Sequence, residues 1–78
     1  MEHAADRQLD ASGLNCPLPI LKTKKALASM AGGETIHVIA TDPGAMPDFA
    51  AYAEHSGHRL HVAEQRGECF HFVLEKVG

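Results

Sequence analysis

Residues 8–30 read QLDASGLNCPLPILKTKKALASM, and this run contains a short strand, a glycine-containing loop and the start of a helix. Residues 8–11 predict the strand, although weakly. The residues from Pro17 to about Met30 favour a helix, which the pair Gly32-Gly33 is expected to end. Four residues recur at spacings of three and four and so mark one face of this helix: Ile20, Thr23, Leu27 and Met30.

The rest of the chain predicts a strand, a helix and two more strands, over residues 35–41, 46–56, 59–65 and 68–77. Gly57 is expected to end the second helix in the left-handed conformation. Alternation should turn Leu60, Val62 and the aromatic residues of the last strand toward the core. We therefore expect Val62 opposite Phe70, across a three-residue loop over 65–67. The order is βαβαββ, and the first two strands should be parallel, with their carboxyl ends at one edge of the sheet.

The size and composition indicate one small domain over residues 8–78, after a flexible tail over residues 1–7. A formal net charge of -3 argues against general nucleic-acid binding. No stretch is long and apolar enough to suggest a membrane span or a secretion signal. Two distant cysteines do not make a disulfide framework, so we expect a reducing, cytoplasmic location.

Cys16 has the most unusual local sequence, since Pro17 and Pro19 follow it at the start of the helix. We expect Cys16 at the N-cap position, where the N–H of Leu18 would be the main donor to its sulfur. The positive end of the helix dipole would also favour the charged form of the sulfur, and so lower the pKa of the thiol. The sequence therefore predicts an exposed, reactive thiolate.

Charged residues near Cys16 have open interpretations. Lys22, Lys24 and Lys25 follow it on the helix and are either a docking patch for an acidic partner or an ordinary solvated face. Asp42 follows the second strand and should reach the same sheet edge as Cys16. A role for Asp42 as a plain helix cap is favoured over a direct part in the chemistry.

Several classes of chemistry are poorly supported. The chain has no Cys-x-x-Cys pair, which argues against a disulfide oxidoreductase, and no His–acid pair is aimed at Cys16 by the local sequence. A domain of this size also lacks room for a deep substrate cavity. A lone, activated sulfur suits a carrier that hands an atom between partners, rather than a self-sufficient enzyme. The alternative is a non-catalytic interaction or regulatory module.

The histidines invite a metal interpretation, but we assign no metal. Alternation places four possible ligands on the sheet face away from the helices: His37, His61, Cys69 and His71. The expected register puts His61 opposite His71. A zinc site is chemically possible there, but a solvated outer face explains these polar residues better.

The run LDASGLNCPLP, residues 9–19, resembles the opening of the TusA/SirA sulfur-carrier family, whose signature is a strand, a glycine-containing loop and Cys-Pro-x-Pro at a helix start. Residues 41–43, 48–49 and 56–58 are similar to its second half, so the resemblance covers about residues 8–77. It implies an α/β (α+β) two-layer sandwich, with two helices on one face of a four-stranded mixed sheet.

The resemblance also implies that Cys16 accepts sulfane sulfur as a persulfide, with Asn15, Pro17, Leu18 and Pro19 as the surrounding motif. It implies a cysteine desulfurase or rhodanese-like donor and a downstream sulfur-acceptor protein. The pathways it implies are tRNA 2-thiolation, sulfur oxidation and cofactor synthesis, and it does not choose among them. We expect a monomer and no cofactor beyond the covalent persulfide.

Overall fold

The computed structural model describes residues 5–78 and contains the six elements that the sequence predicts. In chain order they are β1 (Arg7–Ala11), α1 (Leu18–Ala28), β2 (Thr35–Ala40), α2 (Ala45–Ser56), β3 (Arg59–Arg66) and β4 (Cys69–Glu75). Of the tail expected over residues 1–7, residues 1–4 lie outside the described residues. Asp6 is held to the fold by its N–H, which donates to Thr35 Oγ1 at 3.2 Å, and Arg7 already belongs to β1.

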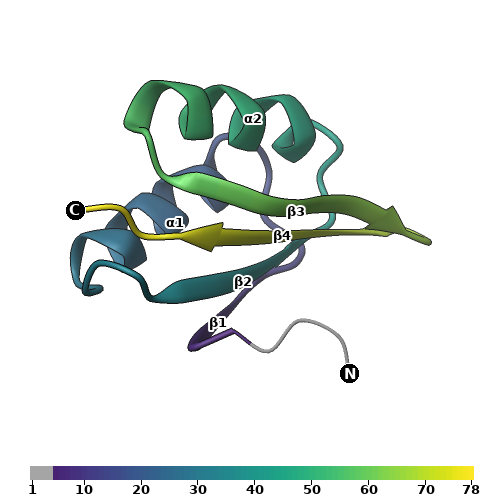
Figure 1. Cartoon of the computed structure of the whole chain (residues 1–78). Helices are drawn as coiled ribbons and strands as arrows, with labels where there is room; N and C mark the ends of the chain where they lie inside the picture. The colour runs from purple at the N-terminus through teal and green to yellow at the C-terminus, as the bar shows by residue number, and fades with distance from the viewer. Residues whose placement is uncertain (1–4) are drawn as a thin grey trace.

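The strands form one four-stranded sheet in the order β1-β2-β4-β3. β1 and β2 are parallel, as expected, and the other neighbours are antiparallel. α1 packs against β1 and β2, while α2 packs against β3 and β4 (Figure 1). The smallest extent of the molecule is 18 Å, which suits one sheet layer covered by one helix layer. The mixed sheet and the two-layer sandwich are therefore confirmed.

The core lies between the sheet and the helices. The rings of Phe49 from α2 and Phe72 from β4 are stacked, with centroids 4.1 Å apart, and both residues are fully buried. The predicted apolar face of α1 is confirmed, because all of its members are buried: Ile20, Thr23, Leu27 and Met30. This packing holds both helices against the sheet.

The helices end close to where the sequence predicts. α1 ends at Ala28 rather than near Met30, because the N–H groups of Ser29 and Met30 bond to carbonyls three residues back and tighten the last turn. Gly57 follows α2 with a φ of 83°, the left-handed end that the sequence predicts.

The register predicted for the β3–β4 hairpin is wrong. Arg66 pairs with Cys69, so the loop has two residues, and Gly67 has a φ of 61° at its first position, as a type II′ turn requires. An irregularity between Leu60 and Val62 shifts the alternation of β3. Leu60 still packs against the core, but Val62 lies opposite Val73 on the outer face instead of opposite Phe70.

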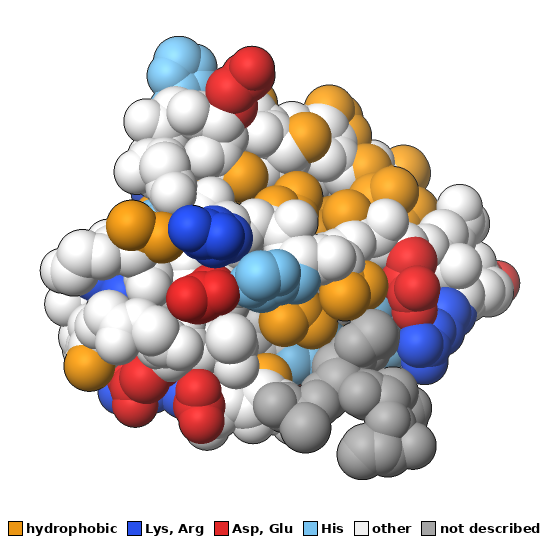
Figure 2. All heavy atoms as spheres, viewed as in Figure 1, with side chains coloured by type: hydrophobic (Ala, Val, Ile, Leu, Met, Phe, Trp, Pro, Cys, Tyr) orange, Lys and Arg blue, Asp and Glu red, His pale blue; other side chains and the backbone are white. Residues whose placement is uncertain are grey.

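The outer face of the sheet carries the predicted histidines in a different arrangement. His37 Nε2 and His71 Nδ1 are hydrogen-bonded at 2.9 Å, whereas His61 bonds to Glu75 Oε1 at 2.7 Å and does not lie opposite His71. Histidine, acidic and basic side chains lie near one another over the sheet in Figure 2, beside a region of hydrophobic side chains. Within residues 5–78, no group of three or more His, Cys, Asp or Glu side chains has an arrangement that could hold a metal ion.

Candidate functional site

Cys16 and Asp42 meet at the carboxyl edge of the two parallel strands, as expected. Cys16 follows β1 and Asp42 follows β2, and the Cys16 N–H donates to Asp42 Oδ2 at 3.3 Å. The same oxygen accepts the N–H of Gly44 at 3.1 Å, which closes a turn of the kind that short acidic side chains favour. Asp42 therefore ties the loop that carries the sulfur to the loop that leads into α2.

Gly44 is packed tightly between these two loops. A Cβ atom added there would lie 2.8 Å from Asp42 Oδ2 and 3.2 Å from Cys16 Cβ. Its φ of -65° is an ordinary helical value, so space rather than backbone conformation favours glycine at this position. The absence of a side chain at Gly44 allows Cys16 to approach the start of α2.

Cys16 is not the N-cap of α1, which corrects the prediction. The N-cap is Pro17, joined to Cys16 by a cis peptide bond, and no side chain caps this helix. The N–H of Leu18, expected to bond to sulfur, donates to the Asn15 carbonyl at 2.8 Å instead. The start of α1 therefore stabilises its own turn and gives the sulfur no hydrogen bond through Leu18.

The sulfur faces a carboxylate that the sequence did not assign to the site. The Cys16 thiol donates a hydrogen bond to Asp48 Oδ2, from the first turn of α2. This hydrogen bond raises the pKa of the Cys16 thiol above its ordinary value; desolvation and the charges of Asp48 and Asp42 act in the same direction. The predicted lowering of the pKa is therefore wrong, whereas the predicted exposure of Cys16 is correct.

The three lysines do not form one cluster around the thiol. Lys24 lines the groove that contains Cys16, and its ammonium lies 5.4 Å from the centroid of the Tyr52 ring. Lys22 and Lys25 line a separate hollow beside Leu9. Of the three candidates for a docking patch, Lys24 alone borders the sulfur groove.

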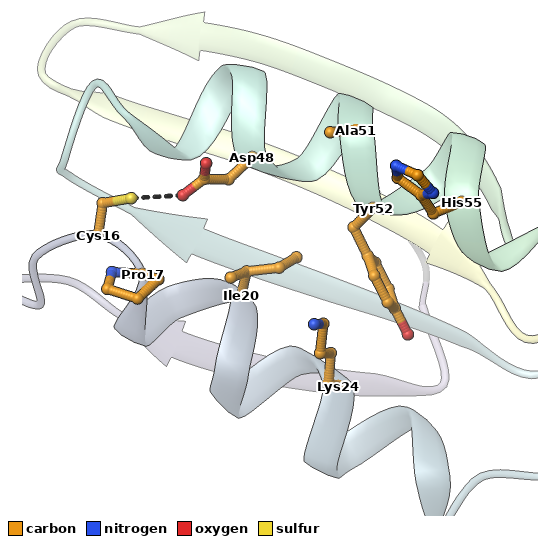
Figure 3. A pocket seen from close by; sticks show the side chains of 8 residues that line it. All are labelled: Cys16, Pro17, Ile20, Lys24, Asp48, Ala51, Tyr52 and His55. Atoms are coloured by element: carbon orange, nitrogen blue, oxygen red, sulfur yellow. Dashed lines mark hydrogen bonds between the residues drawn. The ribbon is translucent and has the colours of Figure 1, made fainter.

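The groove runs from Cys16 between α1 and α2 and has a volume of about 330 Å³ (Figure 3). Eight residues line it: Cys16, Pro17, Ile20, Lys24, Asp48, Ala51, Tyr52 and His55. Asp48 points at the sulfur, while the Tyr52 ring extends from α2 toward α1 farther along the groove (Figure 3). The local sequence does not mark Asp48, Tyr52 or His55 as site residues. An acidic residue in the first turn of a helix that begins at the same sheet edge was the available signal for Asp48.

Comparisons with known proteins identify the family of this chain. Residues 7–76 match the family model described as Sulfurtransferase TusA. The chain belongs to the TusA family. It is 54% identical over 71 residues to the sulfur carrier protein TusA of Allochromatium vinosum, covering 91% of this chain and 93% of that one. A protein of Neisseria meningitidis serogroup A, provisionally named as a sulfur carrier, is 48% identical over 67 residues, or 86% of this chain and 90% of its own.

The fold is shared with a solved relative as well. A crystal structure of a SirA-like protein from Desulfitobacterium hafniense superimposes with a TM-score of 0.79 and 23% identity, covering 92% of this chain and 99% of that chain. That likeness supports the fold alone. The family match and the close relatives indicate the role of a sulfur carrier. Within residues 5–78, neither helix is long and apolar enough to cross a membrane.

Proposed function

We propose that this TusA-family chain carries sulfur as a persulfide on Cys16 and passes it to a partner protein. The observation that carries the proposal is an exposed thiol at the mouth of a groove, held between loops by Asp42 and contacted by Asp48. A carrier needs a sulfur that two different proteins can reach in turn. Cys16 meets this requirement because the sheet edge presents it to solvent.

The loading step is a redox-neutral exchange. The Cys16 thiol releases its proton to water, and the resulting thiolate attacks the outer sulfur of a donor persulfide. The new bond joins the two sulfurs of Cys16–S–SH, the sulfur–sulfur bond of the donor breaks, and the donor leaves as a thiolate. Water returns a proton to the departing thiolate, so the exchange leaves no net change in protons. Delivery follows the same steps in reverse order, with the acceptor's thiolate attacking the outer sulfur on Cys16.

The carboxylates also affect how tightly the sulfur is retained. Persulfides are more acidic than thiols, so the loaded Cys16 carries more negative charge at neutral pH than the unloaded thiol. The negative charges of Asp48 and Asp42 repel that charge, and the same repulsion contributes to the raised pKa of the thiol. Loading is therefore less favourable and delivery more favourable than on a sulfur surrounded by cations, which suits a carrier better than a store.

The proposed donor is a cysteine desulfurase or a rhodanese-like protein, and the proposed acceptor is a cysteine of a downstream protein. The sulfur would serve tRNA 2-thiolation, sulfur oxidation or cofactor synthesis. We propose that the chain works as a monomer in the reducing cytoplasm, where free thiols persist. No cofactor is needed, because the persulfide itself carries the sulfur.

Mass spectrometry of the loaded protein tests the proposal. After incubation with a cysteine desulfurase and cysteine, the wild type should gain one sulfur atom and Cys16→Ser should gain none. Cys69→Ser is the matched control, since Cys69 is half-buried on the outer face of the sheet, and it should load like the wild type. Equal loading of Cys69 in the wild type, or loading of Cys16→Ser, would contradict the assignment.

A further inference from the structure

The groove beside Cys16 has a definite length. Its α1 wall is formed by Ile20 and Lys24, and its α2 wall runs from Asp48 to His55, which are seven positions apart. At a rise of 1.5 Å per residue, these seven positions span about 10 Å. An extended chain advances about 3.3 Å per residue, so the groove accommodates about three residues of such a chain.

The two ends of the groove differ in charge. The sulfur end carries the Asp48 carboxylate, and Asp42 lies behind it. The far end carries the ammonium of Lys24, which lies over the Tyr52 ring. Among the described residues that line the groove, Asp48 is the one carboxylate. The end of the groove at Lys24 therefore has no acidic side chain among these lining residues.

The middle of the groove is apolar and narrowed by an aromatic ring. Ile20 and Ala51 lie on facing helices between the two ends, and the Tyr52 ring crosses toward α1 (Figure 3). Burial raises the pKa of the Tyr52 hydroxyl, a hydrogen bond with Ser56 acts in the opposite direction, and the neutral hydroxyl keeps lone-pair capacity for a peptide N–H. These surfaces suit uncharged residues in an extended segment.

We propose that the groove binds an extended segment of the partner protein, whose reactive cysteine lies at Cys16 and whose acidic side chain, about three residues away, contacts Lys24. The inference rests on the proposed function and adds a requirement on the partner. Lys24 attracts the partner's carboxylate at the far end, away from Asp48, so the charges of segment and groove are complementary along their length. The length of the groove determines the spacing between the cysteine and the acidic residue of the partner segment. It does not determine in which direction the segment runs.

Short synthetic peptides with blocked ends test this spacing. Each peptide carries one cysteine and one glutamate, placed three positions before it, three positions after it, or next to it; glutamine replaces the glutamate in the controls. Cys16 is first loaded with sulfur, and the rate of sulfur transfer to each peptide thiol is measured at low ionic strength. Division by the rate of the same peptide with a small sulfane-sulfur compound removes differences in thiol reactivity.

A glutamate three positions away, on one side of the cysteine, should accelerate transfer about two- to fivefold over glutamine, as expected for an exposed ion pair. Lys24→Gln should abolish this preference, and added salt should weaken it. Lys25→Gln is the matched control, because it removes the same charge from the same helix outside the groove, and it should keep the preference.

Three results would overturn the inference while leaving the proposed function intact: equal rates with glutamate and glutamine, an equal benefit from glutamate next to the cysteine, or equal losses in Lys24→Gln and Lys25→Gln. Glutathione provides a further test. If it accepts sulfur as fast as the best peptide and loses that rate in Lys24→Gln, the occupant is a small thiol and the partner segment is wrong. Failure of Cys16 to load at all would instead contradict the proposed function.

Discussion

Replacing Gly44 by alanine tests the packing that brings Cys16 to the start of α2. Two effects oppose each other. The backbone of Gly44 is helical, so alanine would ordinarily stabilise the protein by about 0.4–1 kcal/mol through the unfolded state. Against this, the new Cβ would lie 2.8 Å from Asp42 Oδ2 and 3.2 Å from Cys16 Cβ, both closer than ordinary contact.

The unfavourable effect should be larger. Asp42 Oδ2 accepts hydrogen bonds from the N–H groups of Cys16 and Gly44, and moving away from the new methyl group would weaken both. Overpacking typically costs about 1–3 kcal/mol. After the favourable backbone contribution is subtracted, the free energy of unfolding should fall by about 1–2 kcal/mol. In a domain of this size, that lowers the melting temperature by roughly 4–8 °C per kcal/mol.

Urea denaturation measures the stability, and alkylation of Cys16 by iodoacetamide reports its surroundings. The same substitution in an Asp42→Ala background should cost about 1 kcal/mol less, because the nearest clashing atom is gone. In the single variant Gly44→Ala, the alkylation rate of Cys16 should differ from that of the wild type, because the new methyl group displaces the loop that carries Cys16. A variant as stable as the wild type, with an unchanged alkylation rate, would refute the tight packing at Gly44.

Three further predictions concern the sulfur, the core and a helix end. In Asp48→Asn, the midpoint of the pH profile for Cys16 alkylation should move to lower pH, because the carboxylate that holds the proton on sulfur is gone; alkylation near pH 7 should therefore be faster. Glu54→Gln, an exposed acid of α2 outside the groove, should leave that profile unchanged, and an unmoved midpoint in Asp48→Asn would contradict the contact. Phe72→Ala removes one of two stacked, fully buried rings and should lower the free energy of unfolding by about 3–5 kcal/mol in urea titrations, whereas a loss below about 1 kcal/mol would exclude its place in the core. Gly57→Ala forces a side chain into the left-handed region and should cost about 1–2 kcal/mol by the same measurement, and a neutral substitution would be inconsistent with that conformation.

Most of the fold could be predicted from the sequence because its signals are local. The helical spacing of Ile20, Thr23 and Leu27 predicts the buried face of α1, and Gly57 predicts where α2 ends. The hairpin register could not be predicted by alternation, because an irregular pairing near Val62 shifts the pattern without a clear mark in the sequence. The prediction of β3 and β4 as strands is therefore correct, but the predicted residue pairs between them are wrong.

The surroundings of Cys16 depended on contacts distant in sequence. The position of Cys16 and its exposure follow from the strand–loop–helix motif, and the meeting with Asp42 follows from parallel strands. The expected low pKa came from a capping rule, which fails because Pro17 occupies the N-cap. Asp48, 32 positions away, reaches the sulfur through the packing of α2 beside α1, and no local pattern contains that contact.

The separation of charge along the groove gives a physical reason for selective exchange. An anionic donor or acceptor that approaches Cys16 directly meets Asp48 and Asp42, which disfavour its arrival. A partner that also contacts Lys24 gains a compensating attraction about 10 Å away, a distance set by the helix rise. Small anionic thiols that reach only the sulfur lack that compensation. With a partner docked at Lys24 as proposed, the acidic surroundings that make the thiol less reactive in isolation disfavour loss of sulfur to free anionic thiols more than exchange with the docked protein.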